Sequence, residues 1–151
     1  MLSMQSKYIM FMAGILICGS LSTGKAWGYE EVVLQTIAME SADQPALGQQ
    51  RVAEVIINRA KLSGESLMAV CLKPKQFSAW NDRKWAVSWL SRHYDTRTRD
   101  NAIHALEMAE NAQNRPLIDH YHRFDVHPSW AKRLKKVEGV GAHVFYSSKG
   151  R

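Results

Sequence analysis

Apolar and polar residues alternate with a helical period along most of the chain. Four apolar residues at helical spacing predict a short amphipathic helix over residues 30–39: Val33, Leu34, Ile37 and Ala38. A second stripe, the strongest in the sequence, predicts a helix from Pro45 to about residue 60, with Asp43 as a candidate cap. Its apolar members are Val52, Val55, Ile56 and Ile57. This pattern places Glu40 where the first helix ends, just ahead of the second.

Further helices follow, separated by a stretch without a helical period. Residues 65–71 predict a short helix, and Pro74 ends it before the loop-like stretch 76–81. Trp85 and Trp89 lie one helical turn apart, and we interpret both as core residues. A longer amphipathic helix ends near residue 114, ahead of a proline, and its apolar positions are Ala102, Ile103, Leu106 and Ala109.

The last third of the chain changes period. Residues 120–124 alternate in the manner of a strand, and residues 142–146 are apolar and β-prone after two glycines. A short basic helix over residues 130–136 is expected between these two strands. The sequence therefore predicts an α+β domain that is predominantly helical, with a small antiparallel sheet near the C-terminus.

The N-terminus has the layout of a secretory signal. Lys7 precedes an apolar run over residues 8–18, and small residues at Ala26 and Gly28 fit a cleavage site. The run is short for a membrane span, which needs roughly 20 residues. We expect a signal peptide at 1–28 and a single domain at 29–151, with an uncleaved anchor as the alternative and the only route to a membrane.

The domain that would remain after export is basic and has one cysteine. The formal charge is +6, and loss of Lys7 and Lys25 with the signal would leave +4. Outside the cytoplasm such a charge favours anionic envelope polymers over nucleic acid. We therefore expect a protein of the periplasm, or of the extracellular cell wall, that acts as a monomer and binds no nucleic acid. Only Cys71 would remain, and its apolar neighbours predict a buried thiol without an internal disulfide.

Glu40 is the first candidate for catalysis. The negative end of a helix and partial loss of water both favour the protonated carboxyl. A general acid that works near neutral pH needs that form. From its position alone, however, an ordinary surface glutamate in a loop is the favoured interpretation of Glu40.

Other residue types suggest chemistry less strongly. His120 and His122 would share one face of a strand, a spacing that metal ligands use, with His127 and His143 as further ligands. No paired cysteines or histidine-rich helix accompany them, so we favour hydrogen-bonding histidines and expect no metal and no cofactor. Neither Ser78 nor Cys71 lies in a nucleophile motif.

The loop over residues 76–81 suits a sugar ligand. Its aromatic residues, Phe77 and Trp80, are bracketed by Gln76, Ser78 and Asn81, whose polar groups can bond hydroxyls while a ring stacks on a sugar face. Simple packing of the loop is the alternative.

In order along the chain, four pieces resemble the SleB-type cell wall hydrolases, which cleave peptidoglycan. They are Ala38-Met39-Glu40, the helix 48–59 that ends in Asn58-Arg59, Gln76-Phe77-Ser78-Ala79-Trp80, and a tail with His120-Tyr121-His122, Pro128-Ser129-Trp130-Ala131 and Gly141-Ala142-His143-Val144-Phe145-Tyr146. The sequence departs from the family at residues 116–119, where a Gly-Ala pair is common, and at Met39.

The resemblance implies a lysozyme-like fold with Glu40 as the catalytic residue. It also implies a set of substrate-contacting residues: Gln76, Phe77, Ser78, Trp80, Tyr121, His122 and His143. The implied reaction is cleavage of peptidoglycan between N-acetylmuramic acid and N-acetylglucosamine.

The number of carboxylates separates two versions of this reaction. Hydrolysis of a glycosidic bond generally uses two carboxylates. Asp43 and Glu54 are the nearest candidates for the second, and neither is persuasive. We therefore expect a lytic transglycosylase that forms 1,6-anhydro products. The alternatives are a lysozyme-type muramidase, a metal-dependent amidase or peptidase, and a wall-binding module without activity.

Overall fold

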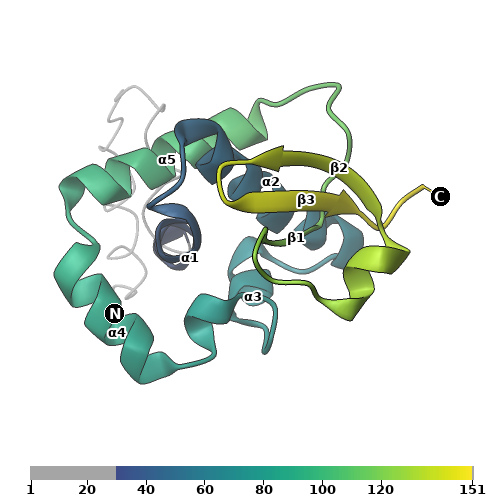
Figure 1. Ribbon diagram of the computed structural model, residues 1–151. Coiled ribbons are helices and arrows are strands. Elements are labelled where there is room, and N and C mark those ends of the chain that lie inside the picture. The colour runs from purple at the N-terminus through teal and green to yellow at the C-terminus, as the bar shows by residue number, and fades with distance from the viewer. Residues whose placement is uncertain (1–29, 151) are drawn as a thin grey trace, which may run out of the picture.

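The computed structural model describes residues 30–150 (Figure 1). The predicted signal peptide lies outside these residues. Within them, no helix combines the length and the apolar character that a membrane crossing requires.

Residues 30–150 contain five α-helices, and their bounds are α1 (Glu30–Ser41), α2 (Ala46–Ser63), α3 (Leu67–Leu72), α4 (Arg83–His93) and α5 (Thr96–Glu110). The periodicity predicted each of them. The predicted cap Asp43 is wrong, because Pro45 occupies the N-cap position of α2 and Asp43 accepts a hydrogen bond from the side chain of Gln44. The helix also runs past residue 60, until Gly64 ends it in the left-handed conformation at φ 72°.

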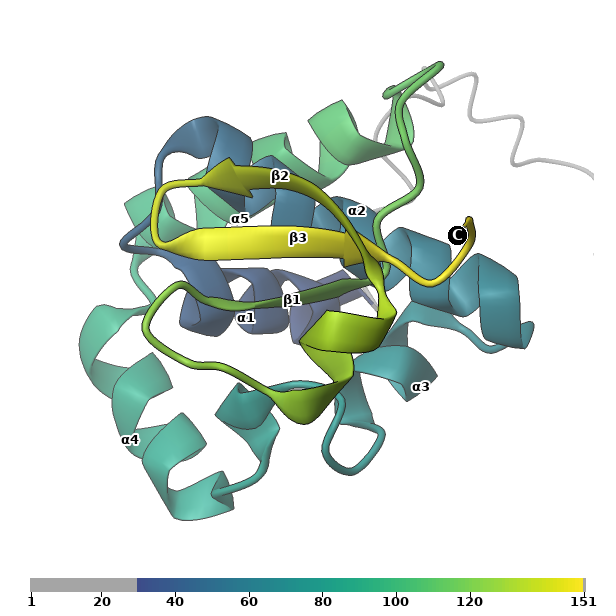
Figure 2. The ribbon, with the colours of Figure 1, turned by 45° about the vertical axis from the view of Figure 1, so that its right-hand side comes forward.

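Helix α2 lies at the centre of the domain. Its residues 50–57 are all buried, since α1, α3 and α5 pack against one side and the sheet against the other (Figures 1 and 2). Ala53 and Ile56 join the helical core. Val52 and Val55 instead pack with Ile118 and Phe145, which attaches the sheet to the helices.

The sheet has three antiparallel strands in the order β1-β3-β2, with bounds β1 (His120–Arg123), β2 (Lys135–Val140) and β3 (His143–Ser147). The prediction of two strands and a basic helix over 130–136 is therefore wrong in part. Only η2 (Ser129–Arg133), a short 3-10 helix, is helical there, and Lys135 and Lys136 begin β2. An irregularity between Lys136 and Glu138 breaks the alternation that would have revealed this strand.

The expected core position of Trp85 is also wrong. Its side chain is 44% exposed and Trp89 is half-buried, while only Ala86 of α4 is buried. Helix α4 packs on the domain through a narrow contact with α1 and the short 3-10 helix η1 (Ser78–Trp80), as Figure 2 shows.

Candidate active site

Three hydrogen-bond donors converge on the carboxylate of Glu40. This residue lies in the last turn of α1. Its Oε1 accepts from the Ser78 hydroxyl at 3.1 Å and from the Ala79 backbone N–H at 2.8 Å. Its Oε2 accepts from the Tyr121 hydroxyl at 2.8 Å. Segments far apart in the sequence, η1 and β1, are thus joined at one carboxylate.

Helix α1 and the core hold η1 in place. The indole N–H of Trp80 donates to the Thr36 hydroxyl at 2.8 Å, one helical turn before Glu40. Phe77 is only 2% exposed and lies beneath the guanidinium of Arg59, at 4.9 Å from its ring centroid. The expectation that Phe77 offers its face to a sugar is therefore wrong, because the ring is enclosed in the core.

Arg59 connects the two segments that supply donors to Glu40. Its Nη1 donates to the backbone oxygen of Gln76 at 2.9 Å, and its Nε donates to that of Asp119 at 2.7 Å. These carbonyls stand two residues before Ser78 and Tyr121 respectively. Burial lowers the pKa of Arg59, and nearby acidic groups oppose that change. Arg59 therefore fixes the spacing between η1 and β1.

The ring of Tyr121 packs against two rings of the neighbouring strand β3. Its centroid lies 4.9 Å from that of His143 and 5.7 Å from that of Phe145. Enclosure, and after it the Glu40 carboxylate, raises the pKa of Tyr121 well above its usual value. Tyr121 is accordingly a neutral donor to Glu40.

His143 is the buried titratable group beside this network. It is 4% exposed, and within the described part of the chain its Nδ1 is buried without a hydrogen-bond partner. Burial lowers the pKa of His143, although the charges of Glu40 and Asp43 raise it. The imidazole is thus kept neutral close to the candidate catalytic carboxylate.

Two further histidines of the tail, His120 and His122, have structural partners at the sheet. His122 contacts the Arg123 backbone oxygen at 2.6 Å through Nδ1 and the Tyr146 hydroxyl at 3.0 Å through Nε2. His120 Nδ1 lies 3.0 Å from a carboxylate oxygen of Asp119. Neither residue touches Glu40.

The histidines do not assemble into a metal site. Over residues 30–150, no group of three or more His, Cys, Asp or Glu side chains is placed to hold a metal ion. Cys71 is buried as predicted, and burial raises the pKa of its thiol to about 11. A thiol in that state is a poor nucleophile.

The two candidates for a second carboxylate have different surroundings. Glu54 is 6% exposed and is occupied by Arg51 at 2.5 Å and Arg115 at 3.3 Å, so it has no access to a substrate at Glu40. Asp43 is exposed in the turn that follows α1, with Arg123 at 3.9 Å. Asp43 is therefore the one of the two that a substrate could reach.

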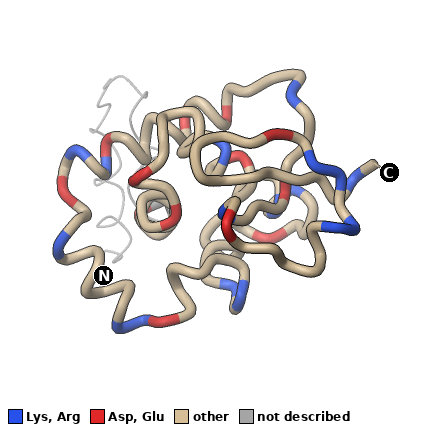
Figure 3. The backbone as a smooth tube through the Cα atoms, viewed as in Figure 1, with Lys and Arg blue, Asp and Glu red and all other residues tan. Residues whose placement is uncertain are grey.

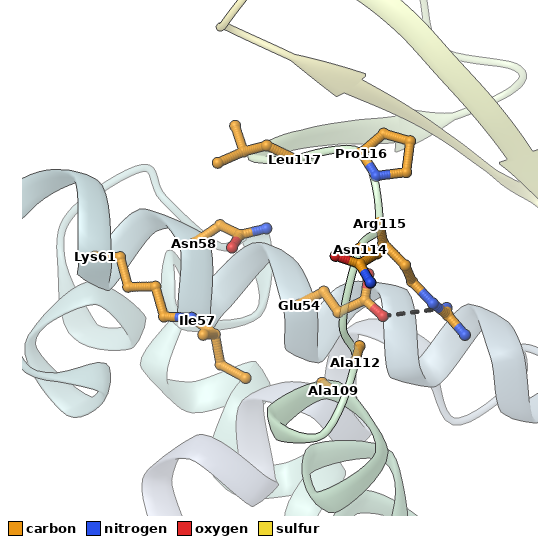
Figure 4. Close-up of a pocket in the computed structure, with 10 residues that line it drawn as sticks. All are labelled: Glu54, Ile57, Asn58, Lys61, Ala109, Ala112, Asn114, Arg115, Pro116 and Leu117. Atoms are coloured by element: carbon orange, nitrogen blue, oxygen red, sulfur yellow. Dashed lines mark hydrogen bonds and ion pairs between the residues drawn. The ribbon is translucent and has the colours of Figure 1, made fainter.

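Two surface pockets of the described residues lie away from Glu40. One, of about 160 Å³, lies between α2, the end of α5 and the segment that leads to β1, and Figure 4 shows the ion pair of Glu54 with Arg115 in its wall. The other, of about 180 Å³, lies between α2 and α5. We place the candidate site at Glu40 because its donors converge there, which neither pocket offers.

The structure brings some of the predicted site residues together and separates others. Glu40, Ser78 and Tyr121 are in direct contact, and Trp80 supports them through Thr36. Gln76 takes part through its backbone oxygen. Sequence reasoning missed the backbone N–H of Ala79, which no side-chain pattern can reveal. It also missed the linking role of Arg59, although that residue ends the strongest apolar stripe.

Comparison with known proteins gives the chain a family. A sequence profile described as Cell Wall Hydrolase matches residues 43–146, which begin three residues after Glu40. A comparison with curated proteins gave no match.

Two solved structures share the fold. The catalytic domain of the germination-specific lytic transglycosylase SleB from Bacillus anthracis matches with a TM-score of 0.62 and 19% identity, over 84% of this chain and 100% of that one. The catalytic domain of the Bacillus cereus SleB protein matches with a TM-score of 0.57 and 22% identity, over 85% of this chain and 100% of that one. The expected α+β, lysozyme-like fold class is therefore confirmed. Since the profile also covers well over half of the sequence, the chain belongs to the SleB-type cell wall hydrolase family.

Proposed function

We propose that the protein cleaves peptidoglycan glycan strands between N-acetylmuramic acid and N-acetylglucosamine, with Glu40 as its catalytic residue. The observation that carries the proposal is the convergence of three donors from η1 and β1 on the Glu40 carboxylate. Membership of the cell wall hydrolase family supports the substrate. The Bacillus anthracis relative, described as a lytic transglycosylase, supports the type of reaction.

The proposed reaction is a lytic transglycosylation that uses one carboxyl group twice. Protonated Glu40 gives its proton to the glycosidic oxygen, and the bond from that oxygen to C1 of N-acetylmuramic acid breaks. The 6-hydroxyl of the same sugar then attacks C1, and the Glu40 carboxylate accepts its proton. The products are a free 4-hydroxyl on N-acetylglucosamine and a 1,6-anhydro ring, and no water is consumed.

The donors around Glu40 suit a group that alternates between acid and base. The Ala79 N–H is fixed and can only donate, so it orients the carboxyl in either state. The hydroxyls of Ser78 and Tyr121 can rotate, and each can donate to a carboxylate or accept from a carboxylic acid. These two residues therefore position Glu40, which is a different role from the direct sugar contact that the sequence suggested.

A lysozyme-type muramidase is the second candidate, and Asp43 is the observation in its favour. Asp43 is exposed in the turn after Glu40, and the charges of both carboxylates act on His143. A hydrolase would need such a second group to activate water or to bind the sugar. If Asp43→Asn abolished cleavage, and the wild-type products carried reducing ends, hydrolysis would replace transglycosylation.

The experiment that tests the proposed function compares wild type with Glu40→Gln on purified peptidoglycan. The wild type should clear the suspension and release anhydro-muropeptides that mass spectrometry identifies. Glu40→Gln should remain folded, by circular dichroism, and lose at least about a hundredfold in rate, as expected for loss of a general acid. Full activity of this variant would refute the role of Glu40.

Analysis of the products, a chelator and a sacculus-binding assay would identify the other two candidate functions. Free stem peptides, together with inhibition by a chelator, would identify a metal-dependent amidase or peptidase. Retention on sacculi without any released fragment would identify a wall-binding module.

The setting of the activity is also a proposal. The signal layout over residues 1–28 supports export to the periplasm or the cell wall, where peptidoglycan is found. N-terminal sequencing of the exported protein should begin near residue 29, and sedimentation should give the mass of a monomer. An exported protein whose N-terminal sequence starts at residue 1 would instead support the uncleaved anchor.

A further inference from the structure

Helix α4 carries a row of three aromatic rings along one face. Trp85, Trp89 and His93 are spaced four residues apart, which aligns them on the helix surface. The ring centroids of the two tryptophans are 6.4 Å apart, and those of Trp89 and His93 are 5.2 Å apart. We call these three residues the α4 aromatic row.

The α4 aromatic row is largely outside the core. Trp85 is 44% exposed, His93 is exposed and Trp89 is half-buried. Leaving an aromatic side chain in water forgoes the free energy that its burial would contribute to folding. Exposed apolar surface of this kind often marks a binding site.

The row begins beside the candidate active site. Helix η1, which supplies Ser78 and Ala79 to Glu40, ends at Trp80, and α4 begins at Arg83. The side chain of Asp82 accepts from the backbone N–H of Trp85 at 3.0 Å and so fixes the start of α4 against this turn. Helix α4 also contacts η1 and α1 directly. A long polymer bound at Glu40 would thus have the row next to it.

Basic residues flank the row at both ends. Arg83 and Lys84 stand at the start of α4 and Arg92 stands near its end. All three are exposed, and α4 itself contains no acidic residue. The exposed Asp82 and Asp95 border the helix, so Figure 3 shows blue segments with red ones near them at both ends. Aromatic rings pack well on the C–H faces of sugars, and cations attract carboxylates. Peptidoglycan carries both groups, since its glycan strands bear acidic peptides.

We propose that the α4 aromatic row is a second glycan-binding surface, which holds a part of the peptidoglycan strand beyond the bond that Glu40 cleaves. Trp85 and Trp89 contact sugar faces, and the flanking basic residues meet carboxylates on the attached peptides. The inference rests on the proposed function, because that function supplies the polymer.

The test measures binding separately from cleavage. Co-sedimentation with purified sacculi is carried out in the Glu40→Gln background, so that the polymer stays intact. Adding Trp85→Ala should weaken binding about tenfold, the effect of losing one well-packed aromatic contact. Val87→Ala is the matched control, because Val87 is 61% exposed on the same helix but outside the row, and it should bind as the parent does.

A second comparison separates the sugar contact from the charge contact. Soluble glycan strands freed of peptide should still lose affinity in Trp85→Ala, whereas Arg92→Ala should weaken binding only to strands that keep their peptides. Unchanged binding of Trp85→Ala to sacculi would overturn the proposal. So would a dimer that this substitution dissociates in sedimentation, or anionic lipid vesicles that bind the parent and not the variant.

The outcome is distinguishable from failure of the proposed function. Activity that survives Glu40→Gln refutes the catalytic assignment, whereas the α4 aromatic row is judged on affinity for the polymer alone.

Discussion

The chemistry of Glu40 depends on how each of its three donors is held. The Ala79 N–H belongs to a backbone turn that Arg59 and Trp80 fix, so its direction is set by the fold. The Tyr121 hydroxyl is at the end of a ring that packs against the rings of His143 and Phe145 on β3. The Ser78 side chain is exposed and short. Of the two hydroxyls, that of Tyr121 is therefore the better constrained and should matter more for catalysis.

Removing the Tyr121 hydroxyl should slow the reaction with little loss of stability. Tyr121→Phe keeps the ring against His143 and Phe145 and deletes only the donor to Glu40 Oε2. A hydrogen bond to a charged group contributes about 1.5–3 kcal/mol, which corresponds to roughly a tenfold to hundredfold lower rate. Release of soluble muropeptides measures the rate. Ser78→Ala should cost less, and equal rates for wild type and Tyr121→Phe would contradict this role.

His143 should make the protein less stable in mild acid. Its pKa in the folded protein is below the ordinary value of 6.5, first because of burial. As the pH falls below that value, the unfolded chain binds a proton that the folded chain does not, so stability present at higher pH is lost. Arg123 and His122 reinforce the lowered pKa, and Glu40 and Asp43 oppose it.

The contribution of His143 is measured by comparison with a variant that does not titrate. Urea unfolding at about pH 7.5 and about pH 5.5 should show a smaller loss of stability for His143→Gln than for wild type. The difference isolates His143 from the other histidines, which both proteins share. An identical loss in both would contradict the prediction.

At the scale of elements, the sequence predicted the helices and the strands β1 and β3, and missed β2. Helices α2 and α5 carry apolar stripes at a regular spacing, and this local pattern is enough to identify them. Strand β2 has no such pattern, because its register shifts between Lys136 and Glu138 and its lysines are exposed. It exists through pairing with β3, which is a contact that single-sequence periodicity does not record.

The candidate site shows the same contrast between what a local pattern identifies and what depends on contacts between distant segments. Glu40, Ser78 and Tyr121 could be selected from the sequence through the family resemblance, but their mutual contacts are tertiary. Phe77 was misjudged because Arg59, 18 residues earlier, covers its ring. The position of Phe77 in a loop does not reveal that a distant side chain packs over its ring.

The turn between β2 and β3 should depend on Gly141. Its φ is 57°, and a Cβ there would lie 2.4 Å from Gln44 Oε1, the acceptor for the Ala142 N–H. Gly141→Ala should therefore lower the free energy of unfolding by about 1–3 kcal/mol, through strain and the displaced Gln44. Gly139→Ala is the matched control, since its nearest contact would be at 3.8 Å. Denaturant titration of both variants checks this, and equal stability would rule out the strain.

At the scale of the whole molecule, a buried group of charges joins the helices to the sheet. Arg51 on α2 pairs with Glu54 on the same helix and with Glu138 on β2. Glu54 also accepts from Gln50 at 2.9 Å and from Arg115, in the segment that leads to β1, at 3.3 Å. Because these contacts link α2 to β2 and to the segment before β1, they help to attach the sheet, and with it Tyr121, to the helices. None of the pairs includes Glu40.

Replacing Glu54 should therefore destabilise the domain without ending the chemistry. Glu54→Ala leaves Arg51, which is 7% exposed, with only the partly exposed Glu138 as counter-ion, and removal of one member of a buried pair costs about 3–5 kcal/mol. Glu138→Ala should cost less, since Arg51 would keep Glu54. Thermal unfolding measures both.

Activity below the unfolding transition then decides what Glu54 does. If it only holds the sheet, folded Glu54→Ala retains most of the wild-type rate and the same anhydro products. If it were the second carboxylate of a hydrolase, the folded variant would be inactive while Asp43→Asn remained active. The pair of variants thus separates a structural carboxylate, buried among cations, from a catalytic one that must meet both water and sugar.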